Sequence, residues 1–302
     1  MHFISTTKKA FTMLEVVFVI VILGIVSSIG AEVIAKVYES YHMQRASYRS
    51  SIKIELATTQ IANRLNYAIP STLIGRVSET TPAFTSAEGM DDVNDTFQYE
   101  VLQWIGYDSD SFGAKPTPGW SGFADVRAST QTKISSPGSD LSTTNLIIAN
   151  LSKGDTKSVS SAVLFFPTEY DTTVIGYAGS TQSSGVHKIS SASGEDIPLA
   201  NSLVGKTIHE HYKLAWSSYA IVPTNKQTAS DGKELYDLVL RYNFQPWNGS
   251  NYTTSNSQLL IQNVSLFQFQ ASATTIRFKL CQREYITNDF FINTCKEKAV
   301  IR

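Results

Sequence analysis

Glu15 is the residue whose position most needs a chemical explanation. It is the one charged side chain between Phe11 and Ala31, a stretch of apolar and small residues. A carboxylate at the centre of a membrane-spanning helix costs about 2.5–3.5 kcal/mol on insertion scales, and less near the interface. We therefore expect Glu15 to have a partner, and a protonated amine would be a suitable one. The alternative is a side chain that reaches the headgroups from the membrane edge.

Two cysteines, Cys281 and Cys295, form the second candidate pair. The chain has no further cysteine and no histidine near them, so a four-ligand zinc site is not expected. Outside the cytosol the two thiols would form a disulfide. Closing a loop of about 15 residues contributes roughly 3 kcal/mol in the chain-entropy model. Two buried free thiols remain the alternative.

Three further groups of polar residues resemble metal sites only in part. "IHEHY" places His209 and His211 on one face of an expected strand, but no third ligand is identifiable. "DSDSFG" begins like a calcium loop, yet Phe112 occupies a ligand position and the closing Glu is missing. "MDDVND" groups further acids. We expect solvated strand residues and ordinary acidic turns, and no bound metal.

Nothing in the sequence indicates catalysis. It contains no G-x-S-x-G elbow, no Walker A loop and no H-E-x-x-H motif, so we predict neither a catalytic residue nor a cofactor. A formal net charge of −1 argues against nucleic acid as a general electrostatic partner. The four tryptophans are able to line a sugar-binding surface, but buried positions are commoner; they are Trp104, Trp120, Trp216 and Trp247.

The element that positions Glu15 is the apolar run from Phe11 to Ala31. As a helix it is long enough to cross a hydrocarbon core of about 30 Å. Lys8 and Lys9 stand directly before it and predict a cytoplasmic N-terminus with the rest of the chain on the other side. A secretory signal peptide would have a shorter apolar region and a cleavage site after it. A plain signal anchor accounts for the length and the lysines, but not for Glu15.

The helical pattern continues beyond the apolar run. No Gly or Pro occurs between Ala31 and Ile69, and Pro70 disfavours helix at the residue before it. We expect one helix from Phe11 to about Asn66, roughly 80 Å long at 1.5 Å per residue. Its second half has an apolar face that must pack on something; the face comprises Val33, Val37, Tyr41, Tyr48, Ile52, Leu56, Ile61 and Leu65.

The segment "KKAFTMLEVVFVIVILGIV" resembles the N-terminal signature of type IV pilins and of the pseudopilins of type II secretion systems. The resemblance implies that a prepilin peptidase cuts between Ala10 and Phe11 and methylates the new amine of Phe11. Glu15 then occupies the fifth position of the mature chain, where the family has a near-invariant glutamate. In the family this side chain is thought to meet the N-terminal amine of a neighbouring subunit. Ala10 departs from the usual Gly, so slower cleavage is expected.

The length and the C-terminal sequence resemble one branch of that family. Major subunits are usually about half as long, so a chain of 302 residues points to a minor subunit. "NVSLFQFQ…TTIRFKL" reads as two strands joined at "ASATT". Together with "IELATTQIANRLNYAIP", it is similar to the J-type minor pseudopilins and their type IV pilus counterparts.

The middle of the chain predicts a β-rich domain. Six short runs are apolar or alternate between apolar and polar residues, with Gly, Pro, Ser and Asp clustered between them; they are "FQYEVLQWI", "TNLIIANL", "SAVLFFP", "TTVIGY", "YKLAWSSYAIV" and "ELYDLVLRYNF". The expected fold is α+β, a long N-terminal helix packed on an antiparallel sheet, as in pilins. Its parts would be a leader (1–10), a transmembrane half-helix (11–31), an amphipathic half-helix (32–69) and a β-rich periplasmic domain (70–302).

The resemblance therefore implies a non-catalytic minor pseudopilin that assembles into or caps a type II secretion pseudopilus or a related fibre. Its partners would be other pilin-like subunits, the prepilin peptidase, membrane lipid and an inner-membrane assembly platform. It would sit in the inner membrane and then be extracted into the fibre.

Two alternatives stay open. The first is a minor type IV pilin for DNA uptake, adhesion or motility, with a local basic patch around Lys226, Lys233 and Arg241 if it binds DNA. The second is a signal-anchored periplasmic binding protein or enzyme.

Overall fold

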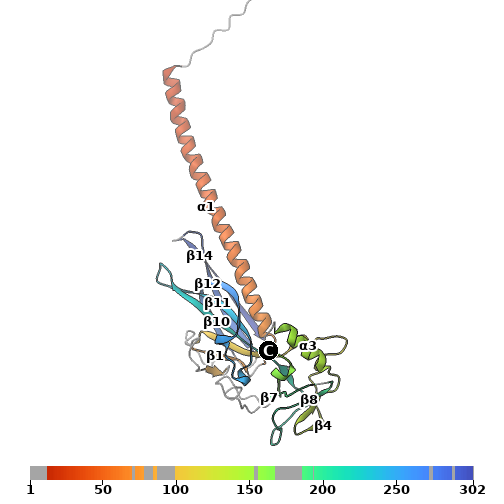
Figure 1. Ribbon diagram of the computed structural model, residues 1–302. Coiled ribbons are helices and arrows are strands. Elements are labelled where there is room, and N and C mark those ends of the chain that lie inside the picture. Colours follow the sequence, from red (N-terminus) through yellow and green to blue (C-terminus); the bar gives the residue numbers. More distant parts are fainter. Residues whose placement is uncertain are drawn as a thin grey trace, which may run out of the picture.

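The computed structural model describes residues 12–69, 72–77, 84–86, 99–152, 156–166, 186–192, 194–271, 275–287 and 290–301. Its dominant element is the helix α1, Met13–Leu65, which projects far out of the rest of the molecule (Figure 1). Thr12 caps its N-terminus and Asn66 its C-terminus. The predicted single long helix is thus confirmed over the described residues.

An eight-stranded sheet forms the main body beside the second half of α1. Every neighbouring pair is antiparallel, and the order is β14-β13-β12-β11-β10-β3-β1-β2. The strands are β1 (Ile74–Arg76), β2 (Phe84–Ser86), β3 (Val101–Gly106), β10 (Ser217–Thr228), β11 (Glu234–Phe244), β12 (Asn256–Ala271), β13 (Thr275–Tyr285) and β14 (Phe291–Ile301). Short 3-10 turns, Pro246–Asn248 and Tyr252–Thr254, connect β11 to β12.

The helix covers the face of the sheet formed by its C-terminal strands, β12 to β14. Its buried side chains recur every three or four residues, as a single helical face requires; they are Ala46, Ser50, Ile54, Ala57, Thr58, Ile61 and Leu65. This face packs on Phe278, Leu280 and Val300 and extends into a core that includes Trp104 and Leu238. The fold is α+β, as predicted.

The predicted packing face of α1 is correct only at Ile61 and Leu65. Tyr48, Ile52 and Leu56 are exposed instead, and the side that meets the sheet contains Ser50 and Ala57. Small and hydroxyl side chains let the sheet approach the helix closely, and their polar groups find partners there. Apolar periodicity alone therefore selected the wrong side of this part of the helix.

A second region, made of the described residues between 107 and 216, lies beyond the C-terminal end of α1 (Figure 1). We call it the accessory region. Its two small sheets contain β4 (Asp125–Thr130), β5 (Lys133–Ser135) and β8 (Asp196–Pro198), and β7 (Val186–Lys188), β6 (Val163–Phe165) and β9 (Lys213–Ala215). The helices are α2 (Ser109–Phe112), α3 (Leu141–Leu151) and the 3-10 turn Val159–Ser161. A core of its own includes Trp120, Ile148, Leu164 and Tyr212.

Some of the predicted strands are confirmed by the structure, and one is wrong. "ELYDLVLRYNF" coincides with β11, "SAVLFFP" contains β6, and the C-terminal pair is confirmed as β12 and β13. "TNLIIANL" is wrong, because it lies in helix α3. Asp140 caps this helix, and its buried residues Leu141, Thr144 and Ile148 follow helical spacing. "TTVIGY" lies outside the described residues, and β14 was not predicted.

Candidate functional site

The first half of α1 is a bare apolar surface. From Met13 to Ala31 every residue is exposed in the isolated chain. With this apolar part, helix α1 is long and apolar enough to cross a membrane. This agrees with a single membrane-anchoring segment near the N-terminus. No charged group other than Glu15 interrupts the segment.

Glu15 takes part in the N-terminal cap of α1. Its Oε2 accepts hydrogen bonds of 3.1 Å from both the backbone N–H and the hydroxyl of Thr12. In return the backbone N–H of Glu15 donates to Thr12 Oγ1 at 3.3 Å. This is a capping box, which satisfies N–H groups that the first turn of a helix leaves without partners. Among the described residues, Oε1 of Glu15 receives no hydrogen bond.

The capping box is a function of Glu15 that the sequence reasoning missed. The pattern Thr12-x-x-Glu15 directly before an apolar run is its sequence signal. A partner within its own chain therefore explains part of the position of Glu15. The capping box does not explain why this position carries a charged glutamate, because a neutral glutamine also completes a capping box.

The remaining N-terminal site residues lie outside the described residues. They are Lys8, Lys9, Ala10 and Phe11. Cleavage after Ala10, methylation of Phe11 and the orientation set by the two lysines thus stay predictions.

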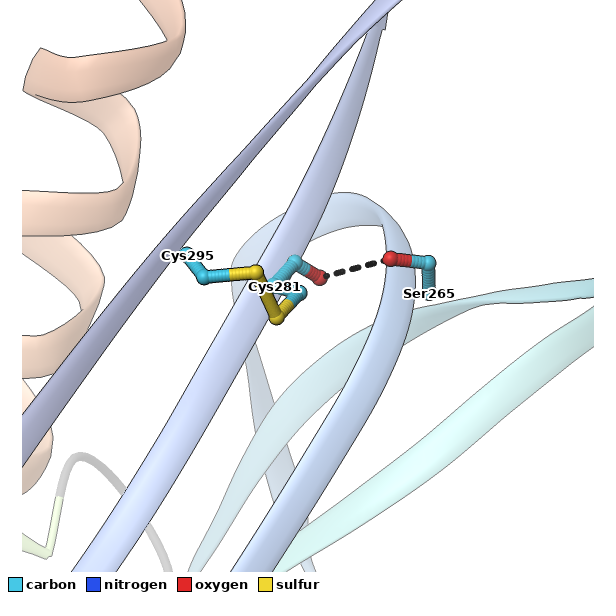
Figure 2. The surroundings of a disulfide bond; sticks show 3 residues. All are labelled: Ser265, Cys281 and Cys295. Atoms are coloured by element: carbon cyan, nitrogen blue, oxygen red, sulfur yellow. Dashed lines mark hydrogen bonds between the residues drawn. A yellow bond between two sulfur atoms is a disulfide. The ribbon is translucent and has the colours of Figure 1, made fainter.

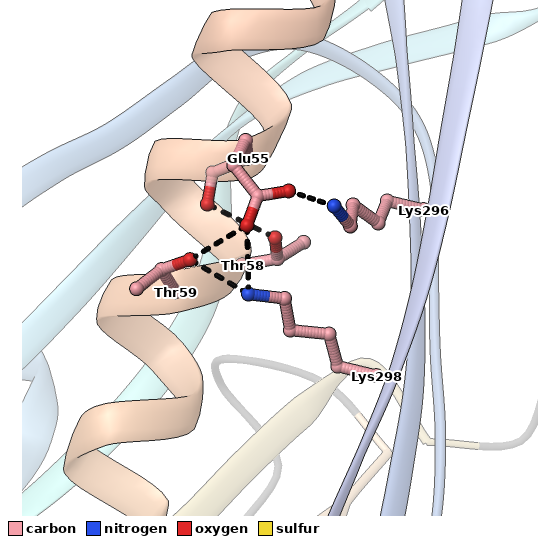
Figure 3. A network of polar contacts seen from close by, with 5 residues as sticks. All are labelled: Glu55, Thr58, Thr59, Lys296 and Lys298. Carbon is pink, nitrogen blue, oxygen red and sulfur yellow. Dashed lines mark hydrogen bonds and ion pairs between the residues drawn. The ribbon is translucent and has the colours of Figure 1, made fainter.

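Polar contacts fix the second half of α1 against the edge of the sheet. Ser50 Oγ donates to Gln282 Oε1 at 2.7 Å, and Lys53 pairs with Glu284 at 2.8 Å. One turn further, Glu55 receives the ammonium groups of Lys296 and Lys298 from β14, as Figure 3 shows.

The two lysines of β14 point toward the helix, and Lys298 is the more buried of the two. Lys298 lies 3.1 Å from Glu55 Oε1 and donates to Thr59 Oγ1 at 2.6 Å. β14 is an edge strand, and charged side chains turned inward make such an edge a poorer template for pairing with another strand. Glu55 thus helps to dock α1 while it neutralises charges that protect this edge.

The predicted disulfide is confirmed, and the free-thiol alternative is wrong. Cys281 and Cys295 are bonded and lie directly opposite each other on β13 and β14, with a Cα–Cα distance of 4.0 Å (Figure 2). Ser265 Oγ of β12 donates to the backbone carbonyl of Cys281 at 3.4 Å. The bond therefore crosslinks the two strands on which α1 rests.

Two of the three candidate metal groups lie in described residues, and neither forms a metal site there. His209 and His211 lie in an irregular segment rather than on a regular strand, and His211 forms an isolated bridge with Phe123. Among the described residues, no cluster of three His, Cys, Asp or Glu side chains exists. "MDDVND" lies outside those residues.

"DSDSFG" forms helix α2 instead of a calcium loop. Asp108 is its N-cap, and Oδ1 accepts a hydrogen bond of 3.1 Å from the backbone N–H of Ser111. The other oxygen, Oδ2, is buried without a hydrogen-bond partner in the described structure. Burial raises the pKa of Asp108 to about 6, and the nearby charge of Asp110 adds to the rise.

The tryptophans do not form an exposed surface for sugar, and the three cations considered for DNA are only partly brought together. All four tryptophans are buried in cores. Lys226 is held by Glu100 at 2.8 Å and Glu234 at 3.5 Å, so its charge is neutralised locally. Lys233 directly precedes β11, whereas Arg241 lies within this strand, eight residues further along the chain, and donates to the carbonyl of Ser255. Lys226 and Lys233 line one surface pocket together with Glu100 and Glu234, and Arg241 is not part of it.

A dense group of hydroxyls in the accessory region has no base beside it. Ser136 Oγ lies 2.7 Å from Tyr212 OH and 2.8 Å from Ser139 Oγ, and it donates to the carbonyl of Phe123 at 2.9 Å. Burial raises the pKa of Tyr212, so the phenol holds its proton. No imidazole, amine or carboxylate of the described chain hydrogen-bonds to Ser136, and its role is to tie strands and loops together.

Comparison of the chain with family models, with curated proteins and with solved structures found no match. Membership of a family is therefore a proposal that rests on the residues of α1 and of the chain before it.

Proposed function

We propose that the protein is a pilin-like subunit, a minor pseudopilin that waits in the inner membrane through α1 and then joins a type II secretion pseudopilus or a related fibre. One observation carries the proposal. Glu15 is the single charge in the exposed apolar half of α1, and it follows the segment "KKAFT" at the spacing that prepilins use.

The bare surface of α1 supports an assembly role. Residues 13–31 are all exposed in the isolated chain, so lipid must cover them while the helix spans a membrane. Once the helix leaves the lipid, only another apolar surface prevents its exposure to water. A bundle of like helices from neighbouring subunits supplies such a surface.

The charge of Glu15 would favour correct docking in that bundle. Cleavage before Phe11 creates an α-amino group, whose unperturbed pKa near 8 leaves it protonated at neutral pH. Its attraction to a carboxylate is several times stronger in a low-dielectric bundle than in water. Oε2 is engaged by Thr12, whereas Oε1 receives no hydrogen bond from the described chain and is available to a neighbour's amine.

The size of the domain favours a minor position. The accessory region adds about 110 residues beyond the end of α1, on the side away from the apolar half (Figure 1). A bulk of this kind is accommodated most easily at a fibre tip, where one copy has no neighbour above it.

Substitutions of Glu15 separate the two roles of this carboxylate. Glu15→Ala removes both the capping box and the charge, whereas Glu15→Gln keeps a capping acceptor and removes only the charge. We expect both variants to stay in the membrane and both to lose incorporation into fibres, measured by co-purification with the other subunits. Normal co-purification of Glu15→Gln would reduce Glu15 to a helix cap and count against the assembly mechanism.

A further inference from the structure

The turn between β13 and β14 carries exposed aromatic side chains. Tyr285 is 37% exposed and Phe290 is 44% exposed. The turn is closed by hydrogen bonds from the N–H groups of Ile286 and Thr287 to the carbonyl of Phe290, at 2.8 and 3.1 Å. We call Tyr285, Ile286, Thr287, Phe290 and Phe291 the hairpin tip.

Arg283 connects the hairpin tip to the neighbouring β10–β11 turn. Its guanidinium forms two hydrogen bonds of 3.0 Å with the carboxylate of Asp231, in the β10–β11 turn. It also lies over the ring of Phe291, with 3.9 Å from its central carbon to the ring centroid. The ring of Tyr285 packs edge-on against Phe291. The two hairpin turns are thereby joined, and both lie at the end of the domain nearest the apolar half of α1 (Figure 1).

The level of the hairpin tip along α1 follows from the bond between Ser50 and Gln282. Ile286 lies four residues beyond Gln282, about 13 Å along an extended strand. The same distance on a helix corresponds to about nine residues, because each residue rises 1.5 Å. The ribbons of α1 and β14 run side by side in similar directions (Figure 1), so the tip reaches the level of Tyr41.

The level of Tyr41 lies about 7–10 Å outside the headgroup layer, when the hydrocarbon core ends at Ala31. Tyr38 and Tyr41 are 63% and 56% exposed and follow the apolar segment that ends at Ala31. Tyrosines enriched beside a spanning segment mark the headgroup layer. Tyr41 stands about 15 Å past Ala31 along the helix. The headgroup layer adds about 5–8 Å on each side of the hydrocarbon core.

A tilt of α1 toward the hairpin would lower the tip toward this layer, and membrane helices tilt by about 20° on average. The exposed rings of Tyr285 and Phe290 would extend the reach further. α1 is uninterrupted from Met13 to Leu65, so no hinge carries the domain away from the bilayer. On the stretch of α1 from Tyr38 to Ser50, exposed Arg45 and Arg49 outnumber the one exposed acid, Glu39, and this balance favours anionic headgroups.

We propose that the hairpin tip rests on the lipid headgroup layer of the membrane that α1 crosses. Tyr285 and Phe290 supply the amphipathic and aromatic contacts that this layer favours, and Arg283 keeps them presented. This contact orients the domain before any fibre forms. It requires a membrane-spanning α1, and it does not depend on assembly into a fibre.

Photo-crosslinking of the full chain in lipid nanodiscs tests this contact. The discs contain phosphatidylethanolamine and phosphatidylglycerol, and benzoyl-phenylalanine replaces Phe290, with Tyr285 as an independent second position. Phe112 is the matched control, because it is also phenylalanine and 48% exposed but belongs to α2 in the accessory region. The same probe at Phe18, in the apolar half of α1, is the positive control, and only preparations in which it labels lipid are compared.

We expect lipid adducts from positions 290 and 285 at a several-fold higher yield than from position 112. Equal yields at the three positions would overturn the proposal, as would adducts to a second protein copy in place of lipid. The Glu15→Gln variant separates this contact from the proposed function. Its hairpin tip still labels lipid if this inference is correct, whether or not the variant enters fibres.

Discussion

Ser50 and Gln282 are 232 residues apart in the chain and share a buried hydrogen bond of 2.7 Å where α1 meets β13. Both side chains are almost fully buried. The amide of Gln282 also donates to Glu284, which in turn pairs with Lys53 of α1. One polar chain thus sets the position of α1 along the sheet, and with it the distance between the sheet and the apolar half of the helix.

Ser50→Ala tests the contribution of this bond to stability. The substitution leaves the buried Oε1 of Gln282 without a donor, and such a loss costs about 1–3 kcal/mol. We expect the free energy of unfolding to fall by that amount in denaturant titrations of the detergent-solubilised protein. The double variant Ser50→Ala/Gln282→Leu removes both partners and is expected to recover part of the loss. Full additivity of the two single substitutions would show that the side chains do not interact.

Breaking the disulfide is expected to weaken the platform on which α1 rests. Cys281→Ser/Cys295→Ser should lower the free energy of unfolding by roughly 3 kcal/mol, the value for a loop of about 15 residues. Denaturant titration with and without reductant measures this. Reductant should lower the midpoint of the native protein and leave that of the double variant unchanged. An equal midpoint for the native protein in both conditions contradicts the expectation.

The raised pKa of Asp108 is expected to make the free energy of unfolding depend on pH. Burial raises the pKa of this carboxyl to about 6 in the folded chain, above its usual value near 4. Between about pH 4 and pH 6 the native state holds a proton that the unfolded chain has lost. Stability from this group therefore decreases as pH rises through that window, by about 2–3 kcal/mol in total.

Asp108→Asn should remove this dependence, because the amide oxygen still caps Ser111 and carries no charge. We expect the variant to exceed the native protein in stability above about pH 7 and to match it more closely near pH 4. Thermal unfolding across this range measures the difference. A gap that does not change with pH would show that Asp108 does not titrate in the window.

Glu55 should contribute much less than Ser50, although Glu55 makes more contacts. Its side chain and that of Lys296 are both more than 40% exposed, so water and salt screen the ion pair. We expect Glu55→Gln to lower the free energy of unfolding by less than about 1 kcal/mol, with the difference shrinking as salt is added. A salt-independent loss of several kcal/mol would contradict this and indicate a buried, structural pair.

The sequence predicted the elements that local patterns specify. The long helix and strand β11 follow from uninterrupted periodicity, and the Cys281–Cys295 pair from cysteine arithmetic. The sequence did not predict strand β14, because the side of it that faces the helix is polar and includes Lys296 and Lys298. An alternating apolar side, the usual signal of a strand, is therefore missing. α3 was read as a strand because its apolar run is short, and only the cap at Asp140 distinguishes the two.

The sequence predicted individual residues of the candidate site but not the contacts that they make. Glu15 stands out from its apolar neighbours, but its bond to Thr12 depends on helix-cap geometry. The sequence did not predict the position of the hairpin tip along α1, because that position depends on the hydrogen bond between Ser50 and Gln282. Contacts of that separation are set by packing of the whole domain rather than by any local pattern.

The mass of the N-terminal peptide tests the central claim most directly. The protein is isolated from membranes of cells that contain a prepilin peptidase, and its N-terminal peptide is sequenced by mass spectrometry. A pilin-like subunit begins at Phe11 and carries one methyl group on its α-amine, with residues 1–10 removed. A chain that still begins at Met1, or that is cut after the apolar segment, would contradict the assignment and leave α1 as a plain anchor or signal sequence.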